Sequence, residues 1–414
     1  MGSGLGGGER HDLRLGAELR TQALPALPAP TDRMRILAVV GTRPEAIKMF
    51  SPVRALRAQP DTFEVFLCSS GQHAELLTEA LETFGLTPDE DLAAMRHDQD
   101  PAELLWTIGR WTSGLARRLQ PDLLLVQGDT ATAMAAALAG YYCGIRVAHI
   151  EAGLRSHDNY APWPEEGTRR MVDAIADLHF APTELAAANL VSEGINRDVI
   201  HVTGNTGIDA LHWVLSQRPA APAPRSGARH VVVTCHRRES VPDGLEAIGR
   251  SVRVLAQLYP DVRFQFVQHP SPAVARAIGT TLASERPPNV ELIPACDYVT
   301  FVGMLADAYL ILTDSGGIQE EAPVLGTPVL VVSSRTDRQE GVRAGTAAIV
   351  GTQVDDIVAA ATRLLDDHQR HSRMATQHDA FGDGRAGERI AAVLTELAIA
   401  NRSEALAERD PSLV

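Results

Sequence analysis

The sequence predicts an α/β protein made of two Rossmann-like domains that face each other across a cleft. Three observations support this prediction. The chain has 414 residues, more than a single hydrophobic core usually supports, so two domains are expected. From Arg35 onward, short apolar runs alternate with longer segments of helical period, as in parallel α/β sheets. This alternation stops at a Pro- and Ala-rich linker, Pro219–Arg225, and then starts again.

The first set of strands follows an amino-terminal segment, 1–33, that is rich in Gly, Ala and Pro and is expected to be disordered. This segment lacks the apolar block of a signal peptide. The strands are short runs of β-branched and apolar residues, and we place them at Ile36–Val40, Phe63–Cys68, Leu123–Val126, Arg146–Ile150, Leu178–Ala181 and Ile200–Thr203. They define a first domain at 34–207.

The second set of strands follows the linker and defines a second domain at 208–383. Its predicted strands are His230–Thr234, Arg263–Val267, Val290–Ile293, Tyr309–Thr313, Pro328–Val332 and Ala347–Val350. A last amphipathic helix, near Glu388–Ile399 within 384–402, is expected to pack back on the first domain, and 403–414 is expected to be a flexible tail. Neither domain has GxGxxG after its first strand, so no tightly held dinucleotide and no other cofactor is expected.

The composition argues against several classes of partner. The chain has 38 Lys and Arg against 52 Asp and Glu, a net charge of -14, whereas nucleic acids and anionic membranes demand a basic surface. No apolar stretch approaches the roughly 20 residues that cross a bilayer. The cysteines are far apart and form no CxxC pair, which favours reduced residues in a cytoplasmic protein: Cys68, Cys143, Cys235 and Cys296. No Cys/His cluster has zinc spacing, so no metal is expected.

The only lysine of the chain, Lys48, is the first candidate site residue. It lies in the run GTRPEAIK, directly after the first predicted strand. Lysine is a compact point charge and arginine a planar fork, so a retained lysine suggests a site that a guanidinium would not fit; the alternative is an accident of composition. Pro44 suits the first turn of a helix, whose amino end would then point toward the loop. Arg43 and Lys48 would add cations to an anion site there.

The run DSGGIQEEAP, which begins at Asp314, is the strongest single motif. It follows a predicted strand and opens a helix. Ser315, Gly316 and Gly317 would let backbone amides approach a phosphate at a helix amino end. Glu321, about one turn further on, is suited to accept hydrogen bonds from ribose hydroxyls. The motif therefore favours a nucleoside diphosphate site, although a Gly-rich turn with a charged helix start remains an alternative.

Carboxylates follow several strands of the predicted first domain. Asp129, Glu151 and either Glu165 or Glu166 lie in loops that would surround one cleft. Such a group is typical of acid–base chemistry; the alternative is that each carboxylate is simply solvated. In the second domain, the loop that begins with His236 would face the same cleft, unless it is a solvated turn.

Seven motifs, in chain order, closely resemble those of the non-hydrolysing UDP-N-acetylglucosamine 2-epimerases: GTRPEAIK, GDT, HIEAGLR, PWPEE, TGNT-x-IDAL, HRRES and DSGGIQEEAP. The resemblance runs from about Met34 to Arg389. It implies the GT-B fold, a homodimer, and an isomerase that interconverts UDP-N-acetylglucosamine (UDP-GlcNAc) and UDP-N-acetylmannosamine. The reaction would pass through elimination of UDP, a 2-acetamidoglucal intermediate and readdition of UDP.

The resemblance also implies site residues by position. The positions that match the family's catalytic residues are Asp129, Glu151, Glu166 and His236. Those that match its substrate-binding residues are Arg43, Lys48, Phe301, Ser315, Gly316, Gly317, Glu321 and Arg338. Three further residues fall where the bacterial enzymes bind a second, activating UDP-GlcNAc: Gln72, His73 and His269.

The chain departs from the family's pattern at a few positions. Ser333 and Gln339 replace the arginine and the proline of a stretch like RDTTERPE, Cys235 stands where glycine is common, and 269–272 is HPSP in place of HLNP. These departures bear on sugar specificity and on activation by an effector. Three alternatives therefore stay open: a hydrolysing UDP-GlcNAc 2-epimerase, a GT-B glycosyltransferase and a non-catalytic UDP-sugar sensor.

Overall fold

The computed structural model describes residues 33–72, 74–93, 100–160, 162–217, 229–235, 243–268 and 286–409. These residues all belong to one compact unit. Within the described ranges, no helix combines the length and the apolar character needed to cross a membrane.

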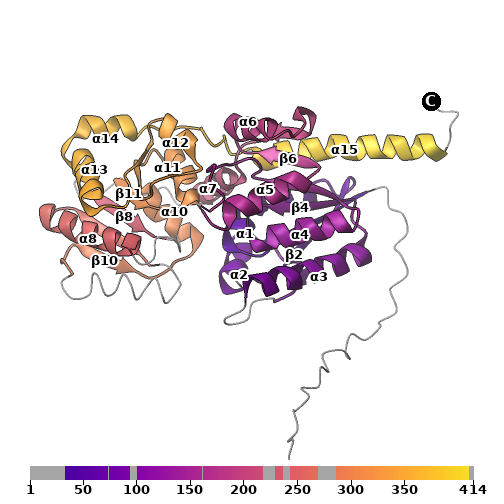
Figure 1. Ribbon diagram of the computed structural model, residues 1–414, viewed down its shortest axis with the longest axis horizontal. Coiled ribbons are helices and arrows are strands. Elements are labelled where there is room, and N and C mark those ends of the chain that lie inside the picture. The colour runs from indigo at the N-terminus through magenta and orange to yellow at the C-terminus, as the bar shows by residue number, and fades with distance from the viewer. Residues whose placement is uncertain are drawn as a thin grey trace, which may run out of the picture. The chain divides into compact units, whose positions relative to one another are not determined.

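The first sheet, of which Figure 1 labels β2, β4 and β6, is entirely parallel and has the strand order β3-β2-β1-β4-β5-β6-β7. Its strands are β1 (Met34–Val40), β2 (Phe63–Ser69), β3 (Glu90–Asp91), β4 (Leu123–Gln127), β5 (Arg146–Ile150), β6 (Leu178–Ala181) and β7 (Ile200–Val202). Six of them agree with the predicted strands to within two residues. The prediction missed β3 because two acidic residues carry no apolar pattern.

The helices of this part cover both faces of the sheet. They are α1 (Arg43–Arg57), α2 (Ala74–Thr83), α3 (Pro101–Leu119), α4 (Ala131–Tyr142), α5 (Glu165–Ile175), α6 (Glu184–Ser192), a 3₁₀ turn at Arg197–Val199 and α7 (Thr206–Gln217). Along β1, Ile36 joins one apolar cluster with Val53 of α1, and Leu37 joins another with Ala136 of α4. Because both faces are buried, β1 is a continuous apolar run rather than an alternating one.

The second sheet is also parallel, with the strand order β10-β9-β8-β11-β12-β13. Its strands are β8 (His230–Thr234), β9 (Arg263–Val267), β10 (Val290–Ile293), β11 (Leu310–Thr313), β12 (Val329–Val331) and β13 (Ala347–Ile349). The described helices are α8 (Asp243–Leu258), α10 (Tyr298–Ala306), α11 (Gly316–Leu325), α12 (Gln339–Arg343), α13 (Val354–Asp366) and α14 (His368–Met374). The predicted α/β class with two parallel sheets is confirmed.

The last helix, α15 (Ala386–Arg409), packs on α1. Gly387 lies so close to α1 that a Cβ atom there would be 2.5 Å from the backbone of Ser51. Asp209 of α7 holds the start of α15, because its carboxylate accepts hydrogen bonds from the amides of Ala386 and Gly387 at 3.0 and 2.7 Å. The division into domains at 34–207 and 208–383 stays a proposal, and the segments 1–32 and 410–414 lie outside the described residues.

Candidate active site

The loop after β1 is fixed by one buried carboxylate. Glu45 accepts hydrogen bonds from the amides of Gly41 and Thr42 at 3.0 and 2.7 Å, and from the Thr130 hydroxyl at 2.7 Å. Burial raises the pKa of Glu45 to about 7, although these hydrogen bonds oppose the rise. Only glycine fits at position 41, since a Cβ atom there would be 2.0 Å from Thr132 Oγ1. Glu45 therefore ties the loop after β1 to the loop after β4.

Four buried side chains close a ring of alternating charge, which we call the charged ring: Lys48, Glu151, Arg338 and Glu320. Lys48 Nζ is 2.7 Å from Glu151 Oε2 and 2.9 Å from Glu320 Oε2. Arg338 completes the ring at 2.9 Å from Glu151 Oε1 and 2.9 Å from Glu320 Oε1. Each carboxylate thus joins both cations through its two separate oxygens. Lys48 and Glu151 follow strands of the first sheet, and Glu320 and Arg338 follow strands of the second.

The ring keeps its cations charged despite their burial. Burial would lower the pKa of the Lys48 amine, but the carboxylates of Glu151 and Glu320 outweigh burial and raise it. Burial likewise opposes the charge of Arg338, and Asp337, Glu320 and Glu151 raise its pKa. Hydrogen bonds between ionised groups in so dry a place are among the strongest that proteins make.

Asp129 is connected to the charged ring through two further residues. Its Oδ2 atom contacts Nη2 of Arg169, a residue that is 1% exposed. Arg169 Nη1 is 3.5 Å from Asp337 Oδ2, and the same oxygen contacts Arg338. The Asp129 side chain is 19% exposed, so it is more accessible than the carboxylates of the ring. The structure therefore brings Asp129, Glu151, Lys48 and Arg338 into one network.

Glu166 does not join this network by a hydrogen bond. Its carboxylate accepts from the amides of Ser156 and His157 at 2.8 and 3.3 Å and from Arg170 Nε at 3.0 Å. Within the described part of the chain, no hydrogen bond links Glu166 to Asp129 or Glu151. Glu166 is instead tied to the backbone of the segment after β5 and to its own helix, α5.

The predicted phosphate cradle lies at the start of α11, which Ser315 precedes as N-cap residue. Gly316 lies against the guanidinium of Arg338, since a Cβ atom there would be 2.9 Å from Cζ of Arg338. At Gly317 a Cβ atom would have nothing within 4 Å, so the backbone is open on that side. Arg338 therefore lies against the helix end at which the sequence predicts an anion.

Glu321 lies on the same helix and is held by a tyrosine. Its Oε1 atom accepts a hydrogen bond of 2.7 Å from the Tyr298 hydroxyl on α10. Burial and the neighbouring charge of Glu320 raise the pKa of Glu321 to about 7, although the bond from Tyr298 lowers it. This carboxyl has one oxygen engaged and is poised to gain or lose a proton near neutral pH.

The remaining predicted site residues lie in several places. Arg43 Nη2 donates to the Cys296 carbonyl at 3.0 Å. Phe301 is half-buried in an apolar cluster of the second sheet. Gln72 Oε1 accepts a hydrogen bond from Thr132 Oγ1 at 2.9 Å. His73, His236 and His269 lie outside the described residues. The described residues contain no group of three or more His, Cys, Asp or Glu that could hold a metal ion.

Sequence reasoning missed Glu320, Arg169, Asp337 and Gln127, whose amide contacts Glu151 Oε2. Glu320 was visible in the motif as a neighbour of Glu321, but its partner Lys48 is 272 positions away in the chain. Its position beside that lysine could not be read from local spacing.

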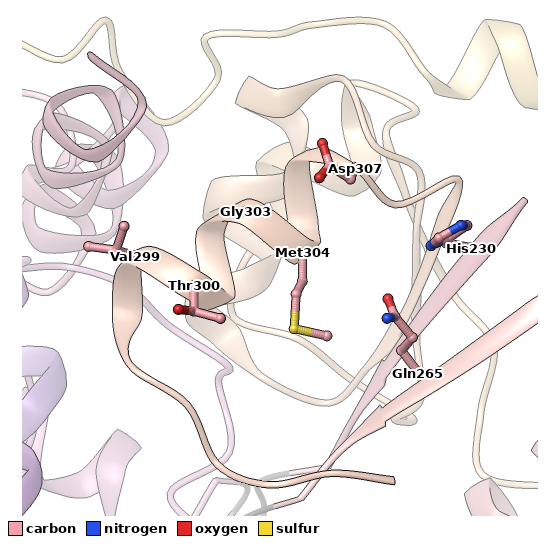
Figure 2. Close-up of a pocket in the computed structure, with 7 residues that line it drawn as sticks. All are labelled: His230, Gln265, Val299, Thr300, Gly303, Met304 and Asp307. Carbon is pink, nitrogen blue, oxygen red and sulfur yellow. The ribbon is translucent and has the colours of Figure 1, made fainter. Parts of the chain in front are cut away.

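A separate hollow of about 400 Å³ lies between α10 and strands β8 and β9 (Figure 2). Met304 and Thr300 border it from the helix, and His230 and Gln265 from the strands. Among the described residues, no predicted site residue lines it.

Comparisons with known proteins decide the family. The family model described as UDP-N-acetylglucosamine 2-epimerase matches residues 54–395. The chain belongs to the UDP-N-acetylglucosamine 2-epimerase family. It is 45% identical over 367 residues to a probable UDP-GlcNAc 2-epimerase of Ralstonia nicotianae, an alignment that covers 86% of this chain and 97% of the relative.

Solved structures of the epimerase family superpose on the chain. The crystal structure of the Neisseria meningitidis UDP-GlcNAc 2-epimerase bound to UDP-GlcNAc gives a TM-score of 0.84 at 39% identity, covering 88% of this chain and all (100%) of that one. The S. aureus MnaA–UDP co-structure gives a TM-score of 0.82 at 38% identity, covering 88% and 96%. The two parallel sheets of this epimerase therefore form a GT-B fold.

The departures from the family's pattern have local contacts in this epimerase. Ser333 Oγ accepts from the Arg335 amide at 3.3 Å, and Gln339 Nε2 donates to the Thr336 carbonyl at 2.6 Å. Cys235 Sγ donates to Asp314 Oδ2 at 3.1 Å. A glycine at position 235 could not make that last contact.

Proposed function

We propose that the chain is a non-hydrolysing epimerase that interconverts UDP-GlcNAc and UDP-N-acetylmannosamine at the charged ring and Asp129. The observation that carries the proposal is the ring itself, in which a carboxylate suited to acid–base work, Glu151, shares two cations with Glu320. The family assignment supports the substrate, because a relative with 39% identity was crystallised with UDP-GlcNAc.

The chemistry requires such groups, because the hydrogen at sugar C2 is not next to a carbonyl. Loss of UDP from C1 gives that carbon oxocarbenium character and acidifies C2. A carboxylate then takes the C2 proton, and the electron pair of the C2–H bond forms the C1=C2 double bond of 2-acetamidoglucal. For the return step, a UDP oxygen adds to C1 while a second acid protonates C2 from the opposite face. Atoms balance without water, metal or redox cofactor.

We assign the two proton-transfer roles to Asp129 and to one of Glu151 and Glu166. In the arrangement described, the Glu151 carboxylate is paired with both Lys48 and Arg338. A substrate diphosphate would compete for the same two cations. As Lys48 and Arg338 turn toward the diphosphate, the Glu151 carboxylate loses these partners and becomes available to the sugar. Substrate binding would thereby free the carboxylate for proton transfer.

The same residues would stabilise the departing UDP. Positive charge from Arg43, Lys48 and Arg338 and the amides of Gly316 and Gly317 would neutralise the developing diphosphate charge. Glu321 would accept hydrogen bonds from the ribose hydroxyls, and Phe301 would lie beside the uracil. His236, by its match to the family's pattern, would assist the leaving group.

The resemblance further supports a cytoplasmic homodimer that binds a second UDP-GlcNAc as an effector through Gln72, His73 and His269. Light scattering after size exclusion tests the dimer, and a sigmoidal dependence of rate on UDP-GlcNAc that becomes hyperbolic in Gln72→Ala tests the effector site. A monomer, or hyperbolic kinetics in the unmodified enzyme, would contradict these two proposals respectively.

Product analysis tests the reaction. The purified protein is incubated with UDP-GlcNAc, and the mixture is resolved by chromatography. We expect UDP-N-acetylmannosamine at a constant ratio to UDP-GlcNAc, with UDP present only in the small amount that escapes the enzyme. Stoichiometric UDP with free N-acetylmannosamine would instead identify a hydrolysing epimerase.

A further inference from the structure

His149 of the HIEAGLR motif is fully buried and has a hydrogen-bond acceptor at each ring nitrogen. Its Nε2 atom is 2.8 Å from the Gly128 carbonyl oxygen, and its Nδ1 atom is 2.7 Å from Asp173 Oδ1. The side chain is 0% exposed. A carbonyl oxygen can only accept, so Nε2 must carry a hydrogen. Nδ1 must carry a second one if Asp173 is ionised.

The surroundings of Asp173 keep it ionised. Burial would raise its pKa, but His149 and Arg155 outweigh burial and lower the pKa to about 2. Arg155 Nη2 donates to Asp173 Oδ2 at 2.8 Å. His179, the other titratable group beside the pair, donates from Nε2 to the backbone carbonyl of Asp173 rather than to its carboxylate, and burial lowers the pKa of His179. The ring of His149 therefore faces one carboxylate and no competing donor among the described residues.

These contacts reach the loops of both proposed catalytic carboxylates. Gly128, which His149 holds by its carbonyl, directly precedes Asp129. Gly153, which follows Glu151 by two positions, donates its amide to Asp173 Oδ2 at 3.2 Å. One buried His–Asp pair thus fixes the ends of β4 and β5 relative to each other.

The turn after β5 needs such support, because Glu151 has a φ of 69°. A non-glycine residue in the left-handed region costs of order 1 kcal/mol or more and persists only where the surroundings impose it. Gly153 is pressed against α6, since a Cβ atom there would be 2.2 Å from the Ala186 carbonyl oxygen. The Asp173 carboxylate closes this turn from the other side.

The network also extends toward Glu166. Arg155 pairs with Glu193 at 2.7 Å, Glu193 with Arg170 at 3.4 Å, and Arg170 with Glu166 at 3.0 Å. The two last links are partly exposed and are therefore weak. Asp173 is the central residue of this network, because both His149 and Arg155 contact its buried carboxylate.

We propose that His149 is a positioning residue whose ring, hydrogen-bonded to the Gly128 carbonyl and to the Asp173 carboxylate, holds the Asp129 loop and the strained Glu151 turn in their reactive arrangement. This inference rests on the proposed function only in that those carboxylates transfer the C2 proton. A residue of this kind changes the rate of chemistry more than it changes substrate affinity.

The test compares His149→Gln, Asp173→Asn and the double variant with His201→Gln, a control on β7, which β6 separates from the strand of His149. We expect His149→Gln to lower kcat about 10- to 100-fold, the usual effect of losing a supporting hydrogen bond near a reacting group, with KM changed less than about threefold. The control should change neither. The double variant should be no less stable than Asp173→Asn, because that single variant leaves the buried ring of His149 without its carboxylate, yet it should not recover kcat.

Nitrogen-15 NMR of the histidine rings tests the two hydrogen bonds of His149 independently of activity. We expect a ring that is hydrogen-bonded at both nitrogens, absent from His149→Gln and without the Nδ1 hydrogen bond in Asp173→Asn. A folded His149→Gln with kcat within twofold of the parent, a double variant with parental kcat, or a His149 ring without these two hydrogen bonds would overturn the inference. Absence of any C2 exchange in the parent would count against the proposed function, and the ring spectrum would still decide the hydrogen bonds of His149. If His149→Gln does not fold, Asp173→Asn carries the kinetic comparison.

Discussion

Replacing Lys48 by arginine keeps the charge of the ring and changes its shape. Lys48 Nζ fits between two carboxylate oxygens at 2.7 and 2.9 Å, and its Cε would lie 3.4 Å from a Cβ atom at Gly207. The guanidinium is wider than the ammonium that these two contacts enclose, so it must push Glu151 or Glu320 aside. Overpacking of this kind costs about 1–3 kcal/mol. Because 1.4 kcal/mol is tenfold, we expect kcat/KM to fall roughly 5- to 150-fold.

Two further variants calibrate this result. Lys48→Met leaves Glu151 and Glu320 with Arg338 as their shared cation in the ring, and an uncompensated buried charge costs about 3–5 kcal/mol, so this variant should be less stable and less active than Lys48→Arg. Arg57→Lys, at the end of the same helix as Lys48 and in an exposed pair with Asp89, should change the free energy of unfolding by less than about 0.5 kcal/mol. Rates come from coupled assay of the epimerised product, and stability from urea unfolding. Parental kcat/KM in Lys48→Arg would refute the reasoning from the ring.

Three other changes test separate parts of the account. Asp129→Asn should lower C2 proton exchange about 10²- to 10⁴-fold, the usual worth of an acid–base group, while UDP affinity measured by calorimetry stays within a few fold; normal exchange would remove Asp129 from the mechanism. Glu321→Gln should weaken UDP binding about tenfold through loss of the charged acceptor, and it should also flatten the stability curve between pH 4.5 and 7. The direction of this pH dependence follows from the pKa of Glu321, which is raised from 4.5 to about 7. The contribution of Glu321 to the free energy of unfolding is full below pH 4.5 and is lost as the pH rises through 7. A Glu321→Gln curve identical to that of the parent would be contrary evidence. The stabilisation from Asp173 has the opposite pH dependence, because the pKa of Asp173 is lowered from 3.8 to about 2. About 2 kcal/mol of unfolding free energy is present above pH 4 and is lost as the pH falls through 2. Asp173→Asn should abolish that loss in acid unfolding.

The strands were predictable from the sequence because both faces of each sheet are buried. A run such as Leu123–Val126 is apolar throughout, and the loop after Gln127 begins at a glycine. The site loops were predictable for the same reason, since they begin where the apolar runs end. The two-residue strand Glu90–Asp91 has no such signal, and its pairing with β2 depends on tertiary context.

The partners within the site were not predictable. The sequence suggested Lys48 as a ligand of a phosphate, but the structure pairs it with Glu151 and Glu320 across 103 and 272 positions of the chain. Local spacing gives the element on which a charge lies, and only the packing of the elements decides which opposite charge it meets. The same limit applies to His149, whose partner Asp173 lies on the next helix of the chain.

Deuterium incorporation at sugar C2 tests the central claim most directly. The protein is incubated with UDP-GlcNAc in D₂O, without nicotinamide cofactor or added metal, and followed by proton NMR. The account predicts that the C2 proton signal is lost from UDP-GlcNAc while UDP-N-acetylmannosamine appears carrying deuterium at C2. Formation of UDP-N-acetylmannosamine with the C2 proton retained, or bound UDP-GlcNAc with no exchange at all, would contradict the elimination mechanism and the roles given to Asp129 and Glu151.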